Sequence, residues 1–131
     1  MALTAPHASA DLKRLSGPAL RTFFRIAEVW SLSRAEQMAL LGLTATSTFH
    51  KWKADSNVRL SPDTLERISY LLGIFKALQI LLPNPHQADQ WVKQPNDAIP
   101  FGGRPPLQHM LQGRMKGLWE VRQYLDAQRG A

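Results

Sequence analysis

Apolar side chains recur at intervals of three and four residues along nearly the whole chain, and this spacing strongly limits the possible folds. It places apolar side chains on one face of an α-helix, whereas a half-buried strand needs strict alternation of apolar and polar residues. No window of the sequence shows that alternation, and no internal repeat appears. The sequence therefore predicts an all-α protein.

Proline, glycine and capping residues divide this pattern into helices. Ser61-Pro62 predicts the start of the longest helix, because serine caps a helix and proline is pre-set for its first position. Pro83 predicts the end of that helix. The first helix is expected to begin at Pro18, after a flexible tail over residues 1–17. The expected helices are 18–30, 33–41, a short one between Thr44 and Asp55, 61–82, 86–94, 106–112 and 115–128.

The long helix is expected to be shared by two halves of the chain, with the boundary inside it. We expect an N-terminal domain over residues 18–70 and a smaller helical domain over residues 71–131. A helix common to both halves would make them one rigid body.

The charge balance favours an acidic partner such as nucleic acid, although a solvated basic face would explain it as well. The net charge is +6, with eight basic and four acidic residues in 1–60, and eight and six in 61–131. The chain has no cysteine, and its N-terminal residues lack the pattern of a secretory signal, so we expect a cytoplasmic protein. The most apolar stretch, about twelve residues, is too short to span a membrane.

The segment from Ser33 to Lys53 has the features of a helix-turn-helix. Ser33 and Glu36 form a capping-box pattern, and Gly42 is placed to end the first helix. On the next helix Phe49 and Trp52 should pack into the preceding helix, which leaves the opposite face for base edges and phosphates. The candidate DNA-binding residues are Arg34, Thr46, Ser47, Thr48, His50, Lys51 and Lys53.

An ordinary pair of antiparallel helices would use the same glycine and aromatic residues. Two positions also depart from the usual helix-turn-helix pattern. Met38 stands where a small residue is usual, and Phe49 comes one residue later than expected after Gly42. The register of the reading residues is therefore open by one position.

No catalytic arrangement is found in the sequence. The histidines stand apart, and no nucleophile and base, pair of catalytic carboxylates or metal-ligand cluster has a workable spacing. We therefore expect neither an enzyme nor a cofactor or metal site.

Two sets of residues together resemble the Xre/MbcA/ParS-type antitoxins, over about residues 18–130. The first set is Trp30-Ser31-Leu32-Ser33, Glu36-Gln37, Leu40-Leu41-Gly42 and Trp52-Lys53. The second and more specific set is Pro83-Asn84-Pro85, Ala88, Trp91-Val92, Pro95-Asn96, Gly103-Arg104-Pro105-Pro106-Leu107 and Gly117.

The resemblance implies the antitoxin of a type II toxin–antitoxin system, in which residues 71–131 bind the toxin and are a candidate for dimerisation. The implied toxin has a RES or related ADP-ribosyltransferase-like fold and acts on NAD. The antitoxin would block that active site and repress the shared promoter, as a homodimer or a hetero-oligomer with toxin. Two alternatives stay open: a stand-alone dimeric regulator, and an inhibitor whose helix-turn-helix no longer binds DNA.

Candidate toxin contacts lie in the loop over residues 100–105 and on the last helix. Arginines there could pair with acidic toxin groups, and a tyrosine could act as an aromatic anchor. The residues expected at this interface are Phe101, Arg104, Arg122, Tyr124 and Arg129.

Overall fold

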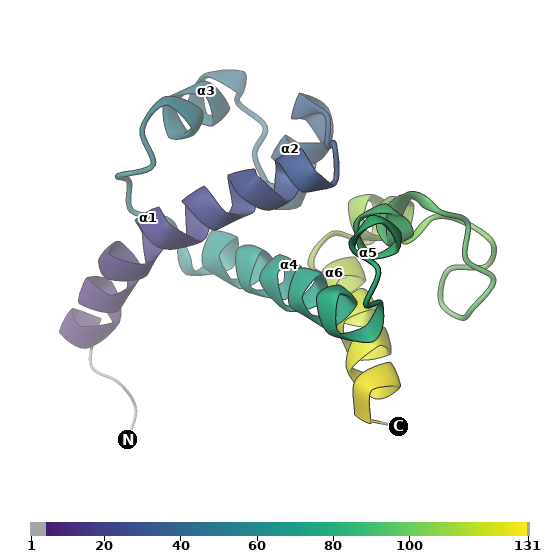
Figure 1. Cartoon of the computed structure of the whole chain (residues 1–131). Helices are drawn as coiled ribbons and strands as arrows, with labels where there is room; N and C mark the ends of the chain where they lie inside the picture. The colour runs from purple at the N-terminus through teal and green to yellow at the C-terminus, as the bar shows by residue number, and fades with distance from the viewer. Residues whose placement is uncertain (1–4, 131) are drawn as a thin grey trace.

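A computed structural model describes the backbone of residues 5–130 and the side chains of residues 14–130. Residues 5–130 contain helices and no strand, which confirms the predicted all-α class. The elements are α1 (Ala5–Val29), α2 (Arg34–Leu41), α3 (Thr46–Ala54), α4 (Pro62–Leu81), α5 (Pro85–Gln90), a 3₁₀ turn (Trp91–Lys93) and α6 (Pro106–Gly130) (Figure 1).

Helix α4 lies at the centre of the molecule, packed against α1 at one end and α6 at the other (Figure 1). Its fully buried side chains include Ile68 and Ile74, which join Leu20 of α1 and Leu118 of α6 in one hydrophobic core. Because α4 contributes to the packing of both halves, they share a core as well as a helix.

The predicted helix ends are largely confirmed, because they depend on local contacts. The hydroxyl oxygen of Ser61 accepts a hydrogen bond from the Thr64 amide at 3.1 Å, and Pro62 is the first residue of α4. Asn84 caps α5, which begins one residue earlier than expected. The two helices expected at 106–112 and 115–128 meet at a kink at Arg114, where φ is 56°.

The expected start of the first helix at Pro18 is wrong. Helix α1 begins at Ala5, so residues 5–17 of the expected tail are helical, while residues 1–4 lie outside the described part. Pro18 sits inside the helix, although proline there lacks a donor and crowds the preceding turn. A tertiary contact anchors the helix just before it: the Leu60 amide donates to the hydroxyl of buried Ser16 at 2.8 Å.

A contact between the two halves lies beside α2. Nζ of Lys93, in the 3₁₀ turn, donates to the carbonyl oxygen of Ser31 at 2.8 Å. Ser31 has a φ of 52°, and its carbonyl belongs to the turn between α1 and α2. Together with the packing of α2 on α6, this bond joins the halves at a second place besides α4.

Candidate functional site

The turn between α2 and α3 has the geometry of a helix-turn-helix. The Glu36 amide donates to the hydroxyl of Ser33 at 3.1 Å, and the Ser33 amide donates to the Glu36 carboxylate at 2.8 Å. Gly42 ends α2 with a φ of 76°, a left-handed conformation that a side chain would strain. The Leu43 amide then donates to the Met38 carbonyl at 2.8 Å, so half-buried Met38 is accommodated at the close of the turn.

Helix α3 is held from beneath by its aromatic residues. Phe49 is 5% exposed and makes an edge-to-face contact with Phe24 of α1, with ring centroids 5.9 Å apart. Trp52 is half-buried beside the same core. Phe49 therefore points inward as expected, but the ring that it meets belongs to α1 rather than to α2.

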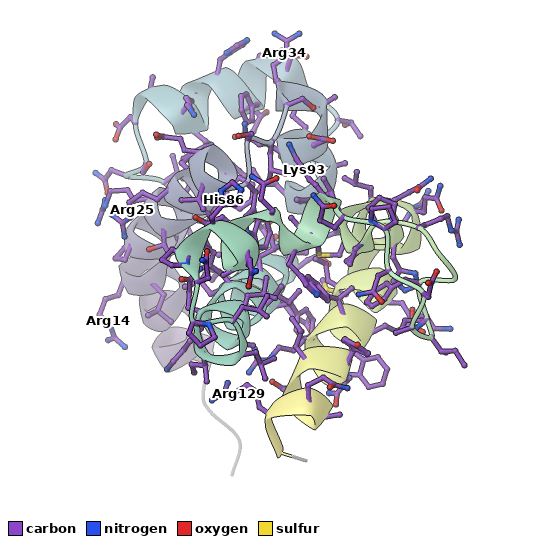
Figure 2. All side chains as sticks on the ribbon, turned by 45° about the vertical axis from the view of Figure 1, so that its right-hand side comes forward. Arg14, Arg25, Arg34, His86, Lys93 and Arg129 are labelled. Carbon is purple, nitrogen blue, oxygen red and sulfur yellow. The ribbon has the colours of Figure 1, made fainter. Side chains whose placement is uncertain are left out.

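Most of the candidate DNA-binding residues are exposed. Ser47, His50 and Lys51 lie on the side of α3 away from Phe49, and this surface is called the reading face below. The helix begins after Ala45, which provides no side-chain cap, so neither Thr44 nor any other candidate hydroxyl caps it. Thr46, Lys53 and Arg34 are also exposed, whereas Thr48 is half-buried. Arg34 is the first residue of α2 and points outward at the end of the molecule where α3 lies (Figure 2).

The loop before α6 folds back tightly on itself. The Phe101 amide donates to the Ala98 carbonyl at 2.7 Å, and the Gly103 amide donates to the Asn96 carbonyl at 2.8 Å. Gly102 and Gly103 have φ values of 61° and 90°, which let the chain reverse directly after Phe101. The loop therefore turns Phe101 inward.

Phe101 lies in the core, which corrects its expected place on a contact surface. It is 0% exposed and meets Trp91 and Tyr124 with ring centroids 5.8 and 5.2 Å away. Tyr124 is half-buried and stacks on Trp91 at 6.2 Å. These three residues, with the His109 ring at 5.7 Å from Phe101, form the aromatic cluster of the C-terminal half.

The three candidate arginines of this half differ in their surroundings. Arg129 and Arg104 are exposed, and Arg104 donates to the Gln112 amide oxygen at 2.9 Å. Arg122 is half-buried, pairs with Asp126 at 3.0 Å, and lies against Gly73 of α4. Its bonds therefore join residues of the chain itself.

The neighbouring Tyr70 phenol on α4 donates to the Glu66 carboxylate at 3.1 Å. Desolvation raises the pKa of Tyr70, and the bond to Glu66 raises it further.

The structure was also searched for a metal site and a membrane span. Residues 5–130 show no group of three His, Cys, Asp or Glu side chains that could hold a metal ion. None of the helices described is both long enough and apolar enough to cross a bilayer.

Comparison with known families decides what the two halves are. The model of the antitoxin Xre-like helix-turn-helix domain matches residues 10–73, and that of the antitoxin Xre/MbcA/ParS C-terminal toxin-binding domain matches residues 77–130. The chain belongs to the Xre/MbcA/ParS antitoxins. The first match ends and the second begins inside α4, so the antitoxin has a helix-turn-helix domain that shares a long helix with its toxin-binding domain.

A relative of similar length supports the continuity of the two domains. The antitoxin is 50% identical over 122 residues to "Uncharacterized protein y4oB" of Sinorhizobium fredii (strain NBRC 101917 / NGR234), which covers 93% of this chain and 92% of that protein. The matched families are of antitoxins and regulators rather than enzymes.

The toxin-binding domain of the antitoxin also exposes apolar side chains that the sequence reasoning missed. Trp119 on α6 is 45% exposed, and Ile99 in the loop is 90% exposed. The buried positions of α6 around Trp119 are Leu118, Val121 and Leu125. Their spacing already excludes Trp119 from the buried stripe, so helical periodicity could have found it.

Proposed function

We propose that this antitoxin neutralises a RES-type, NAD-consuming toxin in the cytoplasm and represses its own operon. The observation that carries the proposal is the combination of an exposed polar reading face on α3 with a toxin-binding domain on the same rigid framework. The RES type of the toxin comes from the resemblance of the C-terminal motifs, and repression comes from the helix-turn-helix.

In this proposal the reading face enters the major groove, and Arg34 and Lys53 bind phosphates beside it. One short helix reads few base pairs, so the operator should contain two half-sites about one helical turn apart, occupied by a dimer or a larger assembly with toxin.

The proposal is tested by expressing the adjacent gene alone and together with the antitoxin. We expect the neighbour alone to stop growth and deplete cellular NAD, and co-expression to restore both. The two proteins should also co-purify as a complex that light scattering can weigh. Arrested growth with unchanged NAD would leave an antitoxin of another toxin class, whereas failure to rescue growth would contradict the proposal.

The toxin contact is proposed to centre on Trp119, with Arg104, Arg129 and the exposed edge of Tyr124 around it. A large aromatic side chain that is exposed in the free protein and buried in a complex is a typical energetic hot spot. Phe101 supports this surface from within the core.

Replacing Trp119 with alanine is expected to weaken toxin binding about 30-fold, since hot-spot truncations cost about 2 kcal/mol or more. Titration calorimetry would measure the dissociation constant, and operator binding should not change. Val29→Ala is the matched control, because Val29 is a 40% exposed apolar side chain of the helix-turn-helix domain. An affinity within twofold of the unmodified protein would remove Trp119 from the interface.

A further inference from the structure

Three cations converge beside α3, on the flank that faces α1. Arg21 and Arg25 of α1 and Lys53 of α3 line a shallow pocket of about 310 Å³, together with Phe24, Glu28 and Ser56. All three cationic side chains are exposed. Within the part of the chain whose side chains are described, no carboxylate forms an ion pair with any of them. The pocket therefore combines three positive charges with the one carboxylate of Glu28.

Contacts of the chain hold each cation in place. Nζ of Lys53 lies 4.7 Å above the centroid of the Phe24 ring, a cation–π distance. Nη2 of Arg25 donates to the Thr22 hydroxyl at 3.2 Å, and the Arg21 guanidinium lies against Gly17. Figure 2 shows Arg25 on the outer side of α1, away from α6. A solvated basic face would spread its charges, whereas these converge and keep donors available.

The pocket continues the reading face around α3. Lys53 follows His50 by three residues, which places it about 60° further around the helix, toward α1. An α-helix with its side chains is about 10–12 Å wide and nearly fills the major groove, so the phosphates of the groove rims lie beside its flanks. One rim would therefore pass over the pocket while the reading face contacts bases.

We propose that Arg21, Arg25 and Lys53 form a binding site for the DNA backbone, in which α1 clamps the phosphates of one groove rim. This inference rests on the proposed DNA binding and adds an element outside the helix-turn-helix to it. Arginine suits this role because its planar guanidinium can donate two parallel hydrogen bonds to a phosphate. The clamp binds every sequence alike, since phosphates carry no base identity.

The test compares Arg21→Gln/Arg25→Gln with a control that loses the same charge elsewhere. The control is Lys76→Gln/Lys116→Gln, two exposed lysines on α4 and α6. Fluorescence anisotropy would measure the binding of the full chain to the region upstream of its gene and to an unrelated duplex of equal length, at several salt concentrations. Circular dichroism would verify that all variants keep their helical content.

We expect Arg21→Gln/Arg25→Gln to bind both duplexes roughly tenfold more weakly at low salt. The slope of log affinity against log salt should become shallower by about two, one for each lost phosphate contact. Arg21→Lys/Arg25→Lys should recover most of the slope, and the control should keep it.

An unchanged slope in Arg21→Gln/Arg25→Gln, with normal binding by the unmodified chain, would overturn the clamp and leave the proposed function standing. Absence of DNA binding by the unmodified chain would overturn both. Loss of toxin affinity with DNA binding intact would assign the pocket to a protein partner and also overturn the clamp.

Discussion

Replacing Phe101 with alanine is expected to lower the free energy of unfolding by about 3–5 kcal/mol, as for other fully buried aromatic side chains. Phe101 is 0% exposed and contacts Trp91, Tyr124 and His109, so its removal leaves a cavity bounded by three rings. Urea denaturation followed by circular dichroism would measure the change. Toxin binding should weaken indirectly, because the loop before α6 loses its internal anchor.

Ile99→Ala is the control for this prediction, because Ile99 is 90% exposed and lies two residues from Phe101 in the same loop. Its free energy of unfolding should stay within about 0.5 kcal/mol of the unmodified value. If Phe101→Ala were equally harmless while toxin binding fell, Phe101 would be a contact residue after all, and the burial described above would not hold in solution.

Replacing Ser47, His50 and Lys51 together with alanine is expected to reduce operator affinity about 100-fold or more. These exposed side chains form the reading face, and a well-placed side chain contributes about 1–3 kcal/mol of discrimination between bases. Affinity for an unrelated duplex should fall much less, since only the charge of Lys51 is lost. Fluorescence anisotropy on both duplexes would measure this difference.

Stability and toxin neutralisation should survive the triple substitution, because the reading face lies opposite buried Phe49. Lys76→Ala provides a control for the loss of one positive charge. A triple variant that represses the operon normally would contradict the placement of the reading face. Loss of growth rescue by that variant would mean that α3 also takes part in toxin binding.

The helix ends could be predicted because a few adjacent residues determine them. Ser33 with Glu36, Gly42 at a positive φ, and Ser61 with Pro62 act within one turn of the chain, and each has the predicted role. The start of α1 could not be predicted in this way. The bond from Leu60 to Ser16 joins residues 44 positions apart, and no local pattern reveals it.

The candidate site was only partly predictable for a related reason. Periodicity orients side chains on helices, which is why Ser47, His50 and Lys51 were expected on the exposed side of α3, where they lie. No such rule applies in the loop before α6. Phe101 there is turned inward by Gly102, Gly103 and hydrogen bonds to Asn96 and Ala98, so its burial depends on the tertiary fold.

Helix α4 acts as a ruler between the two binding surfaces. It carries core residues of both domains, and the bond from Lys93 to Ser31 fixes the same arrangement from the side. One residue added to α4 would turn its two ends by about 100° relative to each other. The length of this helix therefore sets the angle at which a captured partner is displayed over an operator, and so which neighbouring copies can touch along the DNA.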